Sequence, residues 1–284
     1  MSELVLDTAP PRPRRARRNL FLILGIAVLA LLVGVAILGP ALAPYDPTEQ
    51  DLLALLEGPS AAHWLGTDQV GRDILSRLIV GARLTLIIAL ASVAASGVLG
   101  IALGLVAGYF GGAIDRVATA LIDLLLTIPS IVLAIAVVSV VGASATGLTV
   151  AITASFVPPL ARLVRGRVLE LREEDYVSAA RTIGMSTSRL LVRHVLPNAV
   201  SVIVIELSLL AGQAVLVGSA LGFLGLGVQP PDPEWGSMLG SSREFLEVAP
   251  HLAMAPGLAI TLAVFGFNML GDGLRDRFDP NLVL

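Results

Sequence analysis

Few side chains in this 284-residue sequence carry the chemistry of a catalytic or metal-binding group. The three histidines, His63, His194 and His251, lie far apart, so neither a serine–histidine pair nor a histidine metal site is evident. Cysteine is absent, which excludes disulfides, thiolate metal sites and a cysteine nucleophile. Lysine is absent as well, which excludes a Walker A phosphate loop and Schiff-base chemistry. We predict that the chain is not an enzyme and holds no cofactor or metal, so any ATP and magnesium must be bound by another chain.

The other chemically distinctive residues are carboxylates inside apolar stretches of the sequence. Asp123 shares one helix face with Asp115, Thr119 and Thr127, which recur every four residues. A carboxylate inside a membrane normally faces the bundle interior or a water-filled cavity. A pathway and a structural ion pair both remain open, the latter for Asp123 through Arg116. The candidate pathway residues are Asp123, Thr127, Glu206 and Gln213, the last two being seven positions apart on one face.

The composition of the chain predicts that these residues lie on membrane-spanning helices. Hydrophobic residues make up 55% of the chain and charged residues only 14%, against about 25% charge in a soluble domain. A helix crosses the hydrocarbon core with roughly 20 apolar residues. Pro129 predicts a kink in the third candidate span, and Pro158-Pro159 close the short fourth one. The fold class is therefore all-α integral membrane with six spans: 20–38, 84–107, 117–141, 148–160, 199–221 and 252–270.

Arginine placement predicts the orientation, because cytoplasmic loops collect positive charge. The tail holds five arginines and the segment from Arg162 to Arg193 holds seven, whereas the loops 41–83 and 223–250 are rich in carboxylates. Both termini are therefore expected in the cytoplasm. A cleavable signal peptide is the alternative for the first span, but its apolar run is longer than usual and Pro44 follows the exit. The expected segments are a cytoplasmic basic tail (1–19), a first transmembrane helix (20–40), an extracytoplasmic loop (41–83) and a transmembrane domain (84–280) with a cytoplasmic loop (162–198) and an extracytoplasmic loop (223–250).

Small residues recur at four-residue steps in the second span. In lipid, helices associate through close backbone contact between such residues. Tight packing within the subunit is the main interpretation, and a seam between subunits is the alternative. The register consists of Ser92, Ser96, Gly100, Gly104 and Gly108, with a shorter pair, Gly218 and Gly222, in the fifth span.

Residues 175–198 form a polar, arginine-bearing island between two apolar stretches. Gly184 predicts a left-handed stop after a first short helix. Ser186 is expected to cap a second helix, which Pro197 would end before the fifth span. Small side chains at Ser178-Ala179-Ala180 would let another surface approach closely. From the residues alone, a docking hairpin and a solvated connector remain equally open.

This island resembles the cytoplasmic loop of ABC-importer permeases, whose motif runs Glu-Ala-Ala, three residues, Gly, then a stretch ending in Leu-Pro. The sequence has Ser178-Ala179-Ala180, then Gly184, then Leu196-Pro197, so Ser178 departs from the glutamate position. The resemblance implies a coupling helix that docks in a groove of an ATP-binding subunit. The residues assigned to docking on this basis are Tyr176, Ser178, Ala179, Ala180, Gly184, Met185, Ser186, His194 and Pro197.

Further motifs narrow the resemblance to C-type permeases of peptide importers, with the ABC importer type I permease fold. They are His63-Trp64-Leu65-Gly66-Thr67-Asp68 continuing to Gly71-Arg72-Asp73, Phe223-Leu224-Gly225-Leu226-Gly227 with Trp235-Gly236, and Asp272-Gly273-Leu274-Arg275-Asp276 with Asp279-Pro280. The similarity covers roughly residues 20–280. Expected contacts with an extracytoplasmic binding protein are Asp68, Arg72, Asp73, Asp232, Glu234 and Trp235.

The resemblance implies a passive permease subunit in a bacterial plasma membrane. Its partners would be a B-type permease, two ATP-binding subunits, an extracytoplasmic binding protein, a peptide substrate and membrane lipid. Nucleic acid is not expected, since the net charge is only −3. Nickel and glutathione are alternative substrates, because the family it resembles includes importers of both. Many relatives carry an acidic residue near Gly218 and an amide or neutral one where Glu206 stands, and this departure bears on ligand preference and not on the transporter class. An ion-coupled secondary transporter is a weaker alternative, since no internal repeat is seen.

Overall fold

The computed structural model describes residues 14–278, and within that range every regular element is a helix. Most of the predicted basic tail, residues 1–13, and the last two residues of the predicted domain, 279 and 280, lie outside the described residues. Five helices are long and apolar enough to cross a membrane, which confirms the all-α membrane class. They are α1 (Arg14–Leu42), α2 (Ile74–Phe110), α5 (Ala145–Arg172), α8 (Leu196–Phe223) and α10 (His251–Phe278).

The third predicted span is not a single helix. It divides into α3 (Gly112–Leu126) and α4 (Ser130–Val141), which are bent by 92° relative to each other. Pro129 takes an extended conformation, with ψ of 132°, and its ring nitrogen has no hydrogen to continue the helical bonding. The predicted kink is therefore a complete break, and six spans are reached only when this bent pair is counted as one.

Helix α2 packs along α5 through the predicted register of small residues. A Cβ atom on Gly104 would lie 2.7 Å from the Ala161 carbonyl oxygen, and one on Gly108 would lie 2.8 Å from the Val168 Cβ. All five register positions are buried inside this chain. Tight packing within the subunit is thus confirmed, and the alternative of a subunit seam along this register is wrong.

Helix α5 differs from its prediction at its carboxyl end. It continues through Pro158-Pro159 to Arg172, although these prolines were expected to close the span. Pro158 is buried, as are Leu160, Ala161, Val164 and Val168 beyond it. Packing on α2 and α4 holds the helix together across the two missing backbone donors.

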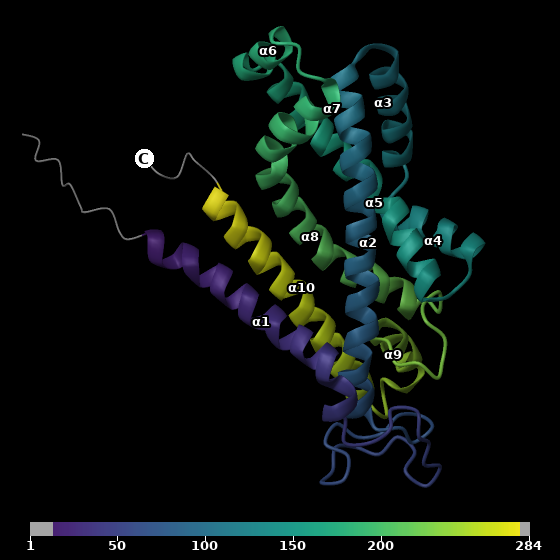
Figure 1. Cartoon of the computed structure of the whole chain (residues 1–284). Coiled ribbons are helices and arrows are strands. Elements are labelled where there is room, and N and C mark those ends of the chain that lie inside the picture. The colour runs from purple at the N-terminus through teal and green to yellow at the C-terminus, as the bar shows by residue number, and fades with distance from the viewer. Residues whose placement is uncertain (1–13, 279–284) are drawn as a thin grey trace, which may run out of the picture.

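The remaining helices arrange around this α2–α5 pair. Helix α1 lies against α10, and α10 in turn packs on α8 (Figure 1). The short helix α9 (Trp235–Ser241) fits between the ends of α8 and α10, and a 3₁₀ turn, η2 (Arg243–Phe245), follows it.

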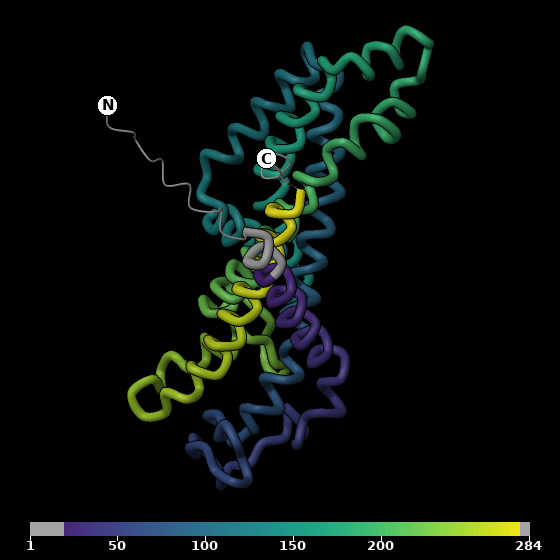
Figure 2. Tube along the Cα trace, turned by 90° about the vertical axis from the view of Figure 1, so that its left-hand side faces the viewer, coloured from purple at the N-terminus to yellow at the C-terminus, as the bar shows by residue number. Residues whose placement is uncertain are grey.

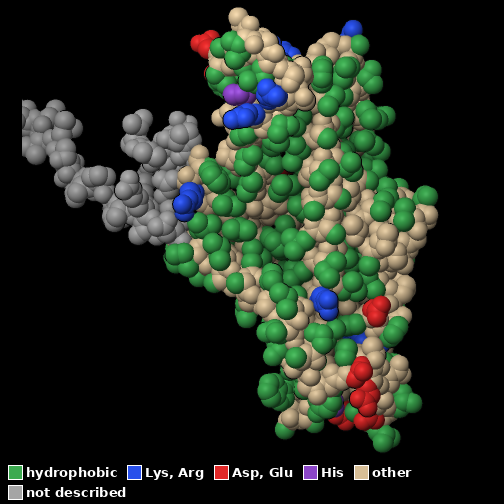
Figure 3. Space-filling model, viewed as in Figure 1, with side chains coloured by type: hydrophobic (Ala, Val, Ile, Leu, Met, Phe, Trp, Pro, Cys, Tyr) green, Lys and Arg blue, Asp and Glu red, His purple; other side chains and the backbone are tan. Residues whose placement is uncertain are grey.

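The two polar parts of the chain lie at opposite ends of the bundle. One end carries α6 (Asp175–Thr182) and α7 (Thr187–Leu190), and the other carries the loop 43–73 (Figures 1 and 2). Arginine and histidine side chains gather near the α6 end, together with some carboxylates at its tip, whereas carboxylates dominate the loop end, and a largely apolar surface lies between (Figure 3). This separation is the one expected of a protein that exposes its two ends on opposite sides of a membrane.

Candidate functional site

Helix α6, the turn after it and α7 form a projection at one end of the bundle, which we call the α6–α7 hairpin (residues 175–190). Gly184 has φ of +78°, which confirms the predicted left-handed stop. The Met185 N–H donates to the Ala180 carbonyl at 3.1 Å, and the Gly184 N–H donates to the Arg181 carbonyl at 2.9 Å. This pair of bonds is a Schellman cap, which satisfies carbonyls at the end of α6 and fixes the direction in which the chain leaves it.

The second half of the hairpin differs from its prediction. Ser186 occupies the N-cap position of α7, but its side chain makes no capping hydrogen bond. Pro197 does not close the helix, because α7 passes through a π-helical turn (η1, Leu191–Val195) directly into α8. The wider π turn leaves room for the Pro197 ring at the start of α8. The hairpin is therefore continuous with a membrane-spanning helix instead of being separated from it.

The hairpin has an inner and an outer face. Val177 and Leu190 are fully buried and Ala180 is 6% exposed, so Ala180 packs inward instead of facing a partner, which corrects its assignment as a docking contact. Ile183, which was not predicted as a contact, is 79% exposed. Its signal in the sequence was a large apolar residue directly before the glycine stop. The other predicted docking residues are exposed at Tyr176, Ser178, Ala179, Gly184, Ser186 and Pro197, and partly buried at Met185 and His194.

Two arginines join the hairpin end to the turn between α2 and α3. The Arg181 guanidinium carbon lies 5.0 Å from the centre of the Tyr109 ring, within the range of a cation–π contact. Arg172, at the end of α5, donates from Nη1 to the Gly108 carbonyl at 3.3 Å. A displacement of α6 would therefore move the end of α2 as well as α8. Sequence reasoning missed both contacts.

The predicted pathway residues do not come together as one cluster. Asp123 forms an ion pair with Arg162 of α5, not with Arg116. Glu206 is half-buried and has no hydrogen-bond or ion-pair partner among residues 14–278. Thr127 and Gln213 are exposed, and the Thr127 hydroxyl donates to the Leu124 carbonyl at 2.6 Å.

A second ion pair joins helices α3 and α5, and its carboxylate lies on the same face of α3 as Asp123. Asp115 accepts two bonds from Arg165, at 2.5 Å from Nε and 2.8 Å from Nη2, and a third from the Thr119 hydroxyl at 3.1 Å. The polar stripe on α3 thus faces arginines of α5, and a structural role accounts for Asp115 and for Asp123.

At the opposite end, the residues predicted to contact a binding protein are mostly buried. Asp73 is 3% exposed; its carboxylate caps α2 by accepting from the Ser76 N–H at 2.7 Å and lies 2.9 Å from His63 Nδ1. Glu234 is 2% exposed and caps α9 through the Gly236 and Ser237 N–H groups.

The other members of that set follow the same pattern. Asp68 binds Arg72 Nε at 2.7 Å, and Trp235 donates from Nε1 to the Leu78 carbonyl at 2.9 Å. Of the six predicted residues only Asp232 is exposed. The five buried residues stabilise this end of the bundle. Of the six, only Asp232 can therefore contact a binding protein directly.

Comparison with known protein families shows the family to which this helical bundle belongs. Residues 100–283 match the family described as the binding-protein-dependent transport system inner membrane component. The chain belongs to this family and is accordingly a multi-pass membrane protein. Residues 14–59 also match the N-terminal transmembrane domain of oligopeptide transport permease C.

Individual relatives resemble the chain over nearly its whole length. It is 43% identical to the dipeptide transport system permease protein DppC of Alkalihalophilus pseudofirmus, over 95% of this chain and 88% of the relative. It is 44% identical to the glutathione transport system permease protein GsiD of Pectobacterium atrosepticum, over 95% and 89%. It is 45% identical to the di/tripeptide transport system permease protein DppC of Pseudomonas aeruginosa, over 91% and 87%.

Proposed function

We propose that this chain is the C-type permease subunit of an ATP-driven peptide importer. The observation that carries the proposal is the α6–α7 hairpin, which exposes Tyr176, Ala179 and Ile183 to a partner while running without a break into α8. Family membership supports a translocating role, and the names of the relatives support short peptides as the substrate. Glutathione is the second candidate, since relatives of similar identity are named for its transport.

The hairpin end is proposed to face the cytoplasm and the loop 43–73 to face outward. The arginines near α6 and the carboxylates near the loop support this orientation. Two ATP-binding subunits would close on the hairpin and shift it, and α8 would carry the shift into the membrane. A B-type permease would complete the pathway, and an extracytoplasmic binding protein would deliver the substrate. The conformational change is driven by the different contacts that the partners make in the two states.

Uptake into liposomes tests this proposal. The complete complex, with its binding protein, should take up peptides only when ATP is supplied on the side of the ATP-binding subunits. A panel of dipeptides, longer peptides, glutathione and nickel separates the candidate substrates. Uptake that continues without ATP but stops when the proton gradient is collapsed would overturn the proposal in favour of ion coupling.

If partner subunits hydrolyse the ATP, the isolated chain should hydrolyse none, because it lacks the lysine of a phosphate-binding loop. Release of phosphate by the purified chain is compared with release by the complex in the same detergent. Turnover that copurifies with the isolated chain, and survives removal of the ATP-binding subunits, would contradict it.

Substitution of Glu206 by glutamine is expected to change uptake without loss of the complex. Glu206 is half-buried and has no partner among the described residues, so its removal breaks no ion pair. If it lines the pathway, the ratio of uptake rates between cationic and neutral peptides should fall by about fivefold, the effect of losing one weakly screened attraction. Ser208→Ala, two residues along α8, is the control. An unchanged ratio across the panel would assign Glu206 to the structure.

The contact between Arg181 and Tyr109 is expected to contribute to coupling. Tyr109→Leu removes the ring that faces the guanidinium and should raise the ATP hydrolysed per peptide by roughly twofold to fivefold, in line with a contact of about 0.5–1 kcal/mol. Tyr109→Phe keeps the ring and should behave like the wild type. Arg181→Gln added to Tyr109→Leu should produce no further loss, whereas fully additive losses would show that the two residues act separately.

A further inference from the structure

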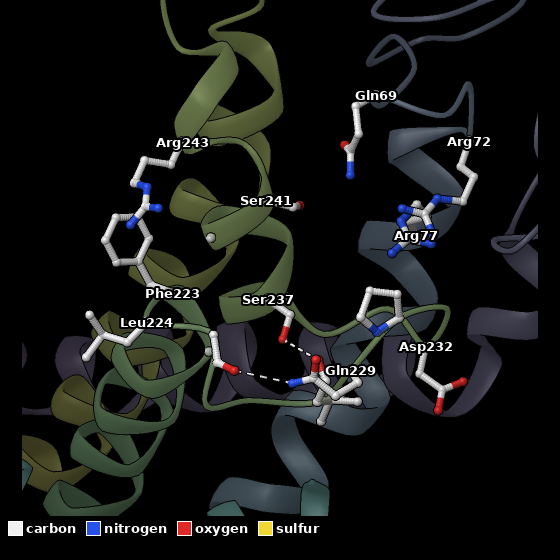
Figure 4. Close-up of a pocket in the computed structure, with 15 residues that line it drawn as sticks. Gln69, Arg72, Arg77, Phe223, Leu224, Gln229, Asp232, Ser237, Ser241 and Arg243 are labelled. Atoms are coloured by element: carbon white, nitrogen blue, oxygen red, sulfur yellow. Dashed lines mark hydrogen bonds between the residues drawn. The ribbon is translucent and has the colours of Figure 1, made fainter. Parts of the chain in front are cut away.

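A cavity of about 280 Å³ with both polar and apolar walls lies at the end of the bundle that carries the loop 43–73. Its walls come from three segments: the loop that leads into α2, the connection between α8 and α9, and the α9–η2 turn (Figure 4). The charged and amide side chains that line it are Gln69, Arg72, Arg77, Gln229, Asp232 and Arg243, and the hydroxyls of Ser237 and Ser241 line it as well. Three of its four charged side chains are arginines, although the rest of this end is rich in carboxylates.

The two inner arginines have only one buried counter-charge. Arg72 and Arg77 are each 5% exposed and share the buried carboxylate of Asp68, while the exposed carboxylate of Asp232 also acts on Arg77. Asp68 Oδ2 lies 2.7 Å from Arg72 Nε and 3.6 Å from Arg77 Nε. The other bonds of Arg77 go to the carbonyls of Pro47 and Pro231, which carry no net charge. A buried cation without a full counter-charge is costly, so the cavity favours the entry of an anion.

The cavity also offers hydrogen-bonding groups that nothing else uses. The terminal nitrogens of Arg72 have no acceptor among residues 14–278, and Arg243 has no partner in that range. The Gln69 side chain has no hydrogen bond among the described residues; its buried oxygen is an unpaired acceptor, and only its amide nitrogen can donate to an anion. Figure 4 shows the Arg72 and Arg77 guanidinium groups side by side, with Gln69 beside them. Planar guanidinium groups bind carboxylate and phosphate in bidentate geometry, and of these two anions the peptides for which the relatives are named carry a carboxylate.

We propose that this cavity binds the free carboxylate of the transported substrate at the outer side of the membrane. The proposal rests on the proposed function for the side and for the substrate. Dipeptides and glutathione share a free terminal carboxylate, which nickel lacks. Phe223 and Leu224, at the end of α8, also line the cavity and supply an apolar wall for an adjoining side chain. Asp232 is exposed on its wall and lowers its affinity for anions.

The absence of cysteine from the sequence allows a direct test. Ser241 is exposed and lines the cavity, so Ser241→Cys places the only thiol of this chain there. In the complete complex, its reaction with an anionic methanethiosulfonate should be about tenfold faster, relative to a cationic one, than that of Leu53→Cys. Leu53 is 95% exposed at the same end and lies beside acidic residues. Labelling is followed on the separated chain, so thiols of partner subunits do not interfere.

Two further variants should shift the reagent preference in opposite directions. Arg243→Gln should lower the preference for the anionic reagent by about threefold, and Asp232→Asn should raise it by a similar factor, because each changes one charge at the cavity. Neither side chain makes a hydrogen bond or ion pair among the described residues, so neither change should disturb the fold. A reagent preference that ignores both substitutions would overturn the carboxylate site.

Protection identifies the source of the carboxylate. A dipeptide without binding protein should slow labelling of Ser241→Cys at least about threefold, while its C-terminal amide should not. Equal protection by the peptide and the amide would contradict the proposal. So would protection by the unliganded binding protein alone, because the carboxylate would then belong to that protein. The charge preference does not depend on transport, so a failed uptake assay and a failed cavity assay can be told apart.

Discussion

Replacement of Gly184 by valine is expected to lower ATP-driven uptake by at least about tenfold while the complex remains assembled. Gly184 has φ of +78°, a conformation that costs an ordinary residue about 1–2 kcal/mol and a β-branched one more. A Cβ atom there would meet no other atom within 4 Å, so the effect comes from backbone strain and not from a clash. Loss of the cap would change the direction of the chain between Ile183 and α7. This would alter the surface that the hairpin presents to the ATP-binding subunit.

The control for Gly184 is asparagine, which tolerates the left-handed conformation better than other side chains. Gly184→Asn should keep most of the uptake, and the ratio of peptide transported to ATP hydrolysed should stay near the wild-type value. Copurification of the partner subunits shows whether the complex is intact. If Gly184→Val transports peptide at the wild-type ratio, the hairpin does not depend on its cap.

Replacement of Gly104 by valine is expected to destabilise the whole bundle. An added Cβ atom would lie 2.7 Å from both the Ala161 carbonyl oxygen and the Val164 Cβ, so α2 and α5 must move apart. Overpacking of this kind costs roughly 1–3 kcal/mol or more, and it lies in the most extensive helix contact of the chain. The melting temperature in detergent should fall by roughly 5–10 °C, with a matching loss of purified protein.

Two other helical glycines provide matched controls for Gly104. Gly166 lies on α5 itself and Gly257 on α10, and a Cβ atom at either would meet nothing within 4 Å. Gly166→Ala and Gly257→Ala should leave the melting temperature unchanged or raise it slightly, because alanine favours helix more than glycine does. A melting temperature for Gly104→Val that matches these controls would show that the α2–α5 seam is not close-packed.

The sequence predicted features whose cause is local. The left-handed stop at Gly184 and the small-residue register on α2 follow from backbone conformation and helical spacing, and both are present. The break at Pro129 was recognised as a kink, but its 92° angle depends on where α4 packs against α5. Pro158-Pro159 predicted the end of a span, but α5 continues through them because it packs against the surrounding helices.

Features that depend on contacts between distant segments could not be predicted. Asp123 pairs with Arg162, 39 positions away, where helical spacing offered Arg116. Asp73 and Glu234 are predicted contacts with a binding protein, yet each is buried and caps a helix. The arginine-lined cavity joins segments about 150 positions apart, as in the bond from Arg77 to Pro231, and nothing in the linear sequence brings them together.

If energy enters this chain through the outer face of α6, a thiol on that face should lie against an ATP-binding subunit, and cross-linking can detect it. Ser178 is exposed on that face, and Ser178→Cys would be the only thiol of the chain. In the complete complex it should cross-link to an ATP-binding subunit, with a yield that changes when ATP is bound, whereas Leu53→Cys at the opposite end should not. If Ser178→Cys forms no cross-link, or is labelled in intact cells by a membrane-impermeant thiol reagent, the outer face of α6 does not receive an ATP-binding subunit.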